Sequence, residues 1–503
     1  MAGRVDATDG SGWLTEQVSL GVLATSVPRD AVDAAVAATG RGARRSDGRL
    51  PPHVMVYFAM AMALFAEEDY EEVLARLTQT LSSWWCWDQG WRLPTSGGIT
   101  QARQRLGFEP LRELFARVAL PVADQLTRGA FVAGWRCMAI DGFEWDAPDT
   151  KANAAEFGFA GVGGADRPAF PKVRVVSISE CASHAVVDAE MGGVTGKGSG
   201  EQSLARRLYP RMGRDWLLIA DRNFYNFTDW CAAVDAGAQL LWRVKADLGL
   251  PALGILPDGS YHSAVIDPAI RGKARRTLLA AVAAGQGVDP ARARPVRVVE
   301  YTVPDRDGDG NGNGNGNGEL ICLLTTIGEP RAAPAVVLAE AYHQRWEHES
   351  GNRQLKTYLR GPGRVLRSRS PDMVRQEIYG YLLTHYAISA LICRAATEAD
   401  IDPDRVKFKR TVRVLRRRVA DSAASPPLPA AATARRGDRG HHRHAQPQPA
   451  APAPFLPARR QTRPAQLLPG QATRRPRRPP RRPCHHHPGE PRRTRTRRMI
   501  NLS

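Results

Sequence analysis

A chain of 503 residues is too long for one compact core, so we expect two or three domains. Its hydrophobic fraction of 43% is typical of a globular protein, and the most apolar run, residues 54–66, is too short to cross a bilayer. The formal net charge of +19 favours a polyanionic partner. Seven cysteines without a CxxC pair exclude a disulfide framework and a zinc motif, which predicts a reducing, cytoplasmic setting.

Most of the excess positive charge lies in residues 421–503. This segment has 18 Arg, no Lys and three acidic residues, whereas residues 1–420 carry 52 bases against 48 acids. It also holds 16 of the 37 prolines and little apolar material, so it cannot build a hydrophobic core. We interpret it as a disordered tail, of a composition that a GC-rich gene yields when read out of frame. The Cys-His-His-His string at 484–487 could bind a metal, but in such a tail an incidental run is the favoured explanation.

Residues 13–128 are predicted to form an all-α N-terminal domain. Helical periodicity runs through 54–77 after two prolines, and further helices are expected at 99–106 and 110–126, on either side of Gly107. A helix, a glycine turn and an arginine-rich helix could bind DNA, and they could equally be part of a plain helical bundle with solvated arginines. The arginines concerned are Arg103, Arg105, Arg112 and Arg117.

From residue 135 to about 244, short apolar segments alternate with helical ones, which predicts a mixed α/β sheet. Residues 245–327 are rich in strand patterns and are expected to be an insertion, followed by helices at 334–358 and 372–396. The insertion contains the string DRDGDGNGNGNGNG at 305–318, which begins like a calcium loop. No carboxylate follows at the twelfth loop position, so we favour a flexible hairpin tip.

Two aspartates are expected at strand ends. Asp141 is predicted to close a strand at 136–140, and Asp221 to close a strand at 216–220. A carboxylate next to an apolar strand is costly to bury unless it is paired or binds a cation. Taken alone, each aspartate is nevertheless more often a turn or helix-capping residue.

Four polar residues share one face of the helix expected at 334–358. At about 100° per residue, Tyr342, Arg345, Glu349 and Lys356 point within roughly 60° of one another. A carboxylate, two cations and a phenol are unusual for a stripe that packs in a core. From the helical phase alone, a solvated face with an Arg345–Glu349 ion pair is the favoured explanation.

The spacing Tyr-x2-Arg-x3-Glu-x6-Lys of these four residues resembles the signature of insertion-sequence 4 family transposases. The strings DG at 141–142, DRNF at 221–224, LWRVK at 241–245 and AYHQRWEHE at 341–349 resemble that family as well. The similarity runs from about residue 13 to residue 420 and ends where the arginine-rich tail begins.

The resemblance implies a fold and a domain organisation. We expect a ribonuclease-H-like mixed α/β sheet at 129–400 with a β-rich insertion at about 245–327, and residues 401–420 as the end of this catalytic region. The helical domain at 13–128 would bind the DNA ends, and the disordered tail would follow from residue 421.

The resemblance also implies site residues. Asp141, Asp221 and Glu349 would bind two Mg²⁺ ions, with Mn²⁺ as a substitute, because Mg²⁺ prefers carboxylate and water oxygens. Tyr342, Arg345 and Lys356 would hold DNA phosphates near the cut. Stacking of Trp242 or Trp346 on an unpaired base is an alternative to a core position for these rings, and the core position is favoured.

The expected function is a DNA transposase that cleaves the terminal inverted repeats of an insertion element and joins them to target DNA. It would act as a homodimer in a synaptic complex in the bacterial cytoplasm, associated with the nucleoid and without a membrane. The alternative is an inactive relic that only binds DNA, which the abnormal tail favours and the intact carboxylates oppose. A ribonuclease-H-like nuclease acting alone would leave Tyr342, Arg345 and Lys356 unexplained.

Overall fold

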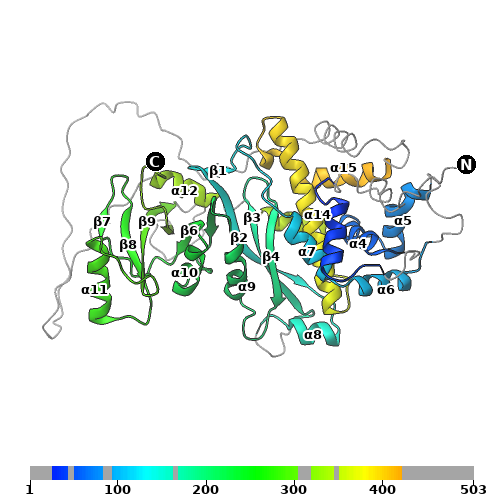
Figure 1. Cartoon of the computed structure of the whole chain (residues 1–503), viewed down its shortest axis with the longest axis horizontal. Helices are drawn as coiled ribbons and strands as arrows, with labels where there is room; N and C mark the ends of the chain where they lie inside the picture. Colours follow the sequence, from blue (N-terminus) through cyan, green and yellow to red (C-terminus); the bar gives the residue numbers. More distant parts are fainter. Residues whose placement is uncertain are drawn as a thin grey trace, which may run out of the picture.

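The computed structural model describes residues 25–43, 50–82, 93–161, 168–303, 319–344 and 350–421. The described chain is elongated, with a helical body at one end and a long mixed sheet that extends from it to the other end (Figure 1). None of the described helices is both long and apolar enough to cross a membrane. The glycine-rich string at 305–318 lies outside the described residues, and so does the tail predicted at 421–503 except for its first residue, Asp421.

The sheet has ten strands in the order β4-β3-β2-β5-β6-β10-β9-β8-β7, and β1 pairs with β2 off this path. The strands β2, β3 and β4 are antiparallel neighbours, whereas β5 and β6 run parallel to β2. The mixed α/β sheet predicted from sequence is therefore confirmed. The strands are β1 (Phe131–Val132), β2 (Trp135–Asp146), β3 (Lys172–Glu180), β4 (Val186–Gly193), β5 (Trp216–Ala220), β6 (Gln239–Val244), β7 (Gly254–Ile255), β8 (Tyr261–Ile266), β9 (Ala293–Val303) and β10 (Glu319–Thr325).

Helices cover both faces of the sheet centre. On one face, α9 (Glu201–Leu208) and α10 (Phe227–Asp235) pack on side chains such as Ile140 and Leu218. On the other face, α12 (Ala335–His343) packs on side chains such as Ala139 and Ile219. Because alternate residues of a strand point to opposite faces, a central strand covered on both sides must be apolar throughout. The sequence WLLIA of β5 meets this requirement, and all five of its residues are buried.

The expected insertion joins the main sheet and does not form a separate layer, because β10 pairs directly with β6. Between β8 and β9 it also contains a helix, α11 (Gly272–Ala283), which the strand-rich interpretation of 245–327 missed. Its alanine-rich sequence favours a helix, and its side chains pack only at the margin of a small cluster around Ile266. The short helix α8 (Lys151–Phe157), capped by the hydroxyl of Thr150, was missed as well.

The helical body consists of α3 (Arg29–Ala38), α4 (Pro52–Leu64), α5 (Tyr70–Ser82), α6 (Ser96–Leu106), α7 (Glu109–Val118), α14 (Pro371–Glu398) and α15 (Phe408–Asp421). The single periodic stretch at 54–77 is in fact two helices. The first ends at Leu64, and the Asp69 carboxylate starts the second by accepting a hydrogen bond from the amide of Glu72. The helix predicted to reach 126 ends at Val118, because the proline at position 121 cannot continue it.

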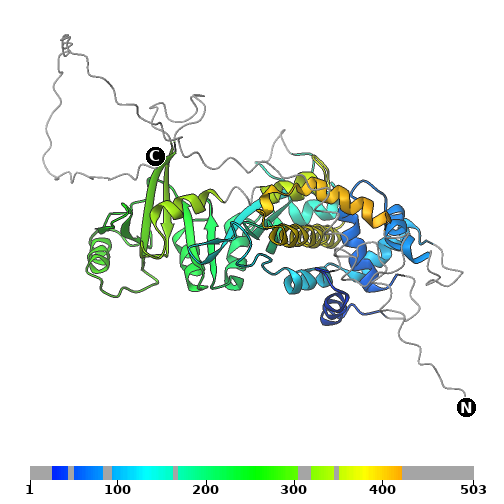
Figure 2. The same ribbon diagram turned by 90° about the horizontal axis from the view of Figure 1, so that it is seen from above.

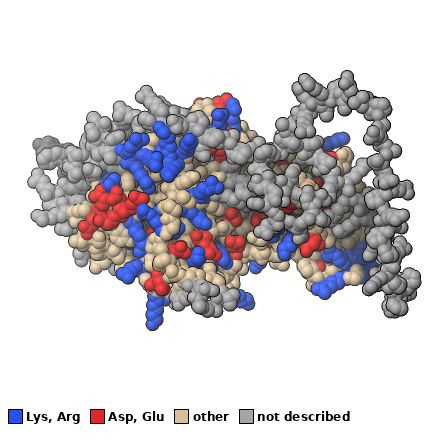
Figure 3. Space-filling model, turned by 180° about the vertical axis from the view of Figure 1, so that it is seen from behind, with Lys and Arg blue, Asp and Glu red and all other residues tan. Residues whose placement is uncertain are grey.

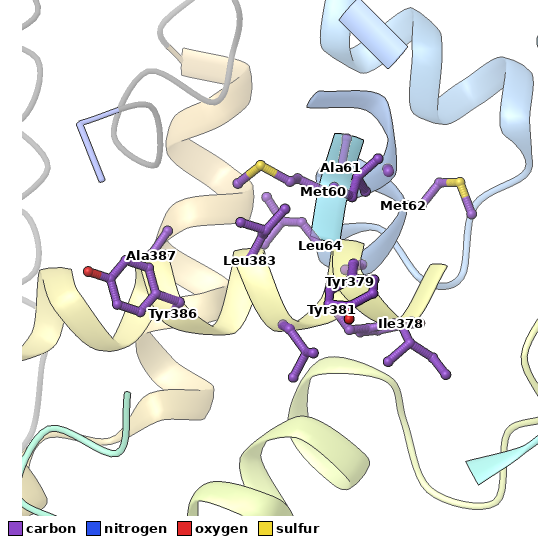
Figure 4. Close-up of a cluster of buried hydrophobic side chains, with 14 of the residues drawn as sticks. Met60, Ala61, Met62, Leu64, Ile378, Tyr379, Tyr381, Leu383, Tyr386 and Ala387 are labelled. Atoms are coloured by element: carbon purple, nitrogen blue, oxygen red, sulfur yellow. The ribbon is translucent and has the colours of Figure 1, made fainter. Parts of the chain in front are cut away.

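The long helix α14 lies at the centre of this body and packs against α4, α7 and α15 (Figures 1 and 2). Every residue of α4 after Pro52 is buried, and so are most residues of α14. In the contact between them, Met60 and Leu64 lie near Leu383 and Tyr381 (Figure 4). Helices from both ends of the described chain therefore share one hydrophobic core.

The α4–α14 contact is close enough to require glycine at position 380. A Cβ atom added at Gly380 would lie 2.5 Å from the carbonyl oxygen of Ala59. We expect Gly380→Ala to destabilise the fold by about 1–3 kcal/mol, as overpacking of a core does. The matched control is Gly97→Ala in α6, where the nearest atom would be 3.9 Å away and alanine favours the helix. Thermal unfolding that lowers the melting temperature of both variants equally would contradict this account of Gly380.

Candidate active site

Asp141 lies inside β2 and not at its end. The strand continues to Asp146 because β3 pairs with it throughout, Asp141 lying opposite Ser177. On the other edge of β2, the pairing with β5 ends at Ile140. The predicted strand end is thus wrong for β2 as a whole and holds only on the side that faces β5.

Asp221 follows β5 directly, as predicted. Because Ile140 pairs with Ala220 in parallel register, Asp141 and Asp221 are the next residues on two neighbouring strands. Such strands lie about 4.8 Å apart, so the two carboxylates start from adjacent backbone positions. Each accepts a hydrogen bond from the next backbone amide, that of Gly142 at 2.8 Å and that of Arg222 at 2.6 Å.

The alternation of β2 places Asp141 on the sheet face that α12 covers, because Cys137 and Ala139 belong to that face. Asp221 continues the alternation of Leu217 and Ile219 in β5, so its position belongs to the same face of the sheet. The chain that continues from α12 reaches this edge, where Nδ2 of Asn352 donates to Oδ2 of Asp141 over 3.4 Å. Glu349 and Arg345 lie outside the described residues.

Asn352 was missed in the sequence, although a signal was present. It lies three residues after Glu349, and at about 100° per residue it falls on the same helical face as the four polar residues. Asn352 is only 8% exposed. A buried amide beside a carboxylate on this face positions the helical segment relative to β2.

Glu201 approaches the same edge from α9, on the opposite face of the sheet. A Cβ atom at Gly142 would lie 2.5 Å from Oε1 of Glu201, so this side chain lies directly over Gly142. Burial raises the pKa of Glu201, and the nearby carboxylates of Asp141, Glu144 and Asp221 raise it further against the opposing effect of Arg174. The edge is therefore a region of concentrated negative charge.

These donors fit a divalent cation only in part. Asp141 and Asp221 supply the hard oxygen ligands that Mg²⁺ prefers, and the neighbouring negative charge would favour a cation. Among the described residues, however, no three His, Cys, Asp or Glu side chains form a group that could hold a metal. A complete site requires a further ligand, and Glu349 is the residue that the sequence motif assigns.

Tyr342 and Lys356 lie in different surroundings. Tyr342, in α12, is 5% exposed and packs under the sheet beside Arg243 of β6. Burial by itself lowers the pKa of Arg243. Glu319 and Tyr342 have the opposite effect through hydrogen bonds and charge, and together they leave the pKa of Arg243 raised. Lys356 is half-buried in η2 (Gln354–Leu359), a π-helix. The regular α-helix predicted through 358 is thus interrupted, and the direction of Lys356 departs from the simple helical phase.

A buried polar chain holds η2 in place. Nε2 of Gln354 lies 2.7 Å from Nδ1 of His184, and its Oε1 lies 3.2 Å from Nε2 of His385 in α14. Nε2 of His184 lies 2.9 Å from Asp404. The chain links the turn between β3 and β4, the π-helix, α14 and the 3-10 helix η3 (Pro403–Arg405). It fixes the register of the segment that carries Asn352 and Lys356.

Arg103 is buried and does not face solvent, which decides against a role of this residue in DNA binding. It is 2% exposed and donates to Oε1 of Gln376 at 2.8 Å, to Oγ of Ser368 at 3.0 Å and to the hydroxyl of Tyr70 at 2.5 Å. Its role is to join α6 to α14. Arg105, Arg112 and Arg117 are exposed, as either interpretation allowed.

Trp242 lies fully buried in β6, with its ring packed against those of Trp230 and Tyr209. The core position favoured for this ring is confirmed. Trp346, the other candidate for base stacking, lies outside the described residues.

The buried chain yields a prediction for Gln354→Leu. This change removes both histidine contacts at similar volume, and leaving buried polar groups unpaired costs about 1–3 kcal/mol. We expect a lower melting temperature, measured by circular dichroism. Thr357→Ala in the same π-helix is the control, since Thr357 is exposed and should be neutral. If Gln354→Leu has the same melting temperature as the control, the contacts of Gln354 with the two histidines do not hold η2 in place.

Comparison with known proteins places the chain beside mobile-element proteins. Residues 17–116 match the family model described as the insertion element 4 transposase N-terminal region. The chain is 29% identical over 342 residues to transposase InsG for insertion sequence element IS4 of Escherichia coli K12, covering 67% of this chain and 69% of that protein. It is 24% identical over 198 residues to the putative transposase InsZ of the same organism, covering 39% and 62%. Among solved structures, a piggyBac transposase synaptic complex with hairpin DNA aligns over 84% of this chain and 85% of that one, at 9% identity and a TM-score of 0.39.

Proposed function

The chain belongs to the insertion element 4 family of transposases, and on this premise we propose that it cleaves the ends of its element and joins them to target DNA by two-metal phosphoryl transfer. The observation that carries the proposal is the parallel register of β2 and β5. It brings Asp141 and Asp221 to adjacent positions on the sheet face where Asn352 contacts Asp141.

The proposed catalytic core is ribonuclease-H-like. Its support is the path of the first five long strands: β2, β3 and β4 form an antiparallel meander, and β5 and β6 then add in parallel on the other side of β2. The helices α9 and α10 connect β4 to β5 and β5 to β6. The strands β7–β10 would be the β-rich insertion, which extends the same sheet.

Asp141, Asp221 and Glu349 would hold two Mg²⁺ ions, for which Mn²⁺ would substitute. Bound there, the ions would supply a nucleophile and stabilise charge on the phosphate. The carboxylates of Asp141 and Asp221 are fixed by backbone amides at their Oδ1 atoms. The amide of Asn352 orients Oδ2 of Asp141. Arg345 and Lys356 would hold the phosphates that flank the cut. Tyr342, which the motif assigns to the same role, is buried beside Arg243 and would support the fold next to them.

The partners in this proposal are the terminal inverted repeats and target DNA, and synapsis would pair two copies of the chain, in the bacterial cytoplasm and next to the nucleoid. A relic that only binds DNA is the second candidate. The acidic cluster around Asp141 opposes it, because burial and the neighbouring carboxylates raise the pKa of Glu201, and a bound cation would offset this concentration of negative charge.

The first test concerns the carboxylates. Asp141→Ala, Asp221→Ala and Glu349→Ala should each abolish Mg²⁺-dependent cleavage of element ends, because no metal pair forms without all three ligands. Binding to the ends, measured by fluorescence anisotropy without metal, should stay nearly unchanged. Asp247→Asn, an exposed acidic residue after β6, is the control and should cleave normally. Robust cleavage by Asp221→Ala protein would refute the assignment.

The second test separates DNA contact from chemistry. Arg345→Ala and Lys356→Ala should weaken binding to element ends, and each should lower the slope of log K against log salt by about one. The slope is measured by anisotropy titrations over a series of salt concentrations. An unchanged slope in both variants would leave these residues as part of a solvated surface.

A further inference from the structure

Helix α15 has one apolar and one cationic face. Phe408, Val412 and Leu415 are at most 3% exposed and belong to the core shared with α4 and α14. Lys409, Arg413 and Arg417 are exposed. The apolar face is thus occupied by the protein itself, and what α15 offers to a partner is charge.

The three exposed cations form a regular stripe. They are spaced four residues apart, so each is displaced from the last by about 6 Å along the helix and by only about 40° around it. Arg405, exposed in η3, precedes the stripe. In the part of the chain that the structure describes, the side chains of Lys409, Arg413 and Arg417 have no ion pair. Exposed arginines elsewhere do, as Arg117 with Glu113 and Arg211 with Asp188 show.

The acidic side chains near α15 that the structure describes have other partners: Asp404 lies 2.9 Å from His184, and Glu68 pairs with Arg76. Glu67 pairs with Arg364 at 2.9 Å and lies near Arg416, which also donates to the carbonyl oxygen of Leu64. This side of the helix is thus neutralised and packed. Seen from behind, lysines and arginines gather at the end of the molecule where Figure 1 places α15, beside a smaller acidic patch (Figure 3).

The helix that carries the stripe contacts the segment that leads to the candidate active site. α15 packs against η2, the π-helix that carries Lys356, and the same segment places Asn352 against Asp141. A polyanion bound along α15 would therefore continue toward the carboxylate edge. A membrane surface fits poorly, since a helix that binds one inserts its apolar face, and that of α15 is buried.

We propose that Lys409, Arg413 and Arg417 bind the phosphate backbone of duplex DNA next to the cleavage site, independently of its sequence. The inference rests on the proposed function and adds to it the surface along which the DNA leaves the active site. Backbone contacts of this kind position the duplex and carry no sequence information.

The test compares two triple variants of the full-length chain. Lys409→Gln, Arg413→Gln and Arg417→Gln together remove the stripe and keep good helix formers. Arg271→Gln, Lys273→Gln and Arg276→Gln together remove three exposed charges at or near α11, at the other end of the molecule (Figure 1). The arginine-rich residues 421–503 are present in every protein and contribute equally. Binding to a duplex of arbitrary sequence is titrated against salt, and thermal unfolding verifies that both variants are folded.

If the stripe binds DNA, its removal lowers the slope of log K against log salt by about three, while the α11 variant changes it by less than one. Equal changes in both variants would show an effect of net charge alone and overturn the inference. If the wild-type protein cleaves element ends and the stripe variant keeps the wild-type slope, the stripe does not bind DNA. That result would refute the inference and leave the proposed function intact. Wild-type protein that binds no duplex would refute both.

Discussion

The candidate site depends on the unequal pairing of one strand. β2 is twelve residues long and pairs with β3 from Met138 to its end at Asp146, but β5 pairs with it only from Arg136 to Ile140. Beyond that point β2 has a neighbour on one side only. The free side is where Asp141 and Asp221 leave the ladder together, so charged side chains can occupy the centre of a sheet that is apolar elsewhere.

The rest of the molecule keeps this edge in register. The helical body rests on α14, which contacts α4 on one side and the π-helix on another. Buried polar groups add direction to this apolar packing. Arg103 ties α6 to α14, and Gln354 ties η2 to α14 and to the turn before β4. Since a buried polar group is costly without its partner, these links define one arrangement of the helices around the site.

The sequence was informative wherever a local pattern decided the structure. The apolar run of β5 and the aspartate after it were recognisable because a strand buried on both faces has no other composition. The strand-end position of Asp141 was wrong because it depends on which neighbour pairs with β2, and that contact spans distant segments. His184 and Gln354 carry no local signal, as their partners lie 31 to 220 residues away along the chain. Arg103 resembled a surface cation because nothing nearby in sequence reveals Gln376.

The π-helix at Gln354–Leu359 also constrains changes of length in this segment of the chain. The backbone amide of Arg360 donates a hydrogen bond to the carbonyl oxygen of Leu355, five residues earlier, whereas in an α-helix the acceptor is four residues earlier. Loss of a single residue within the segment would allow an ordinary α-helix. Every later residue would then turn by about 100° relative to those before it. Such a deletion would not lower the helix propensity of the segment. It would, however, change the direction of the residues after Gln354 relative to Gln354 itself, so their contacts and those of Gln354 could not form together.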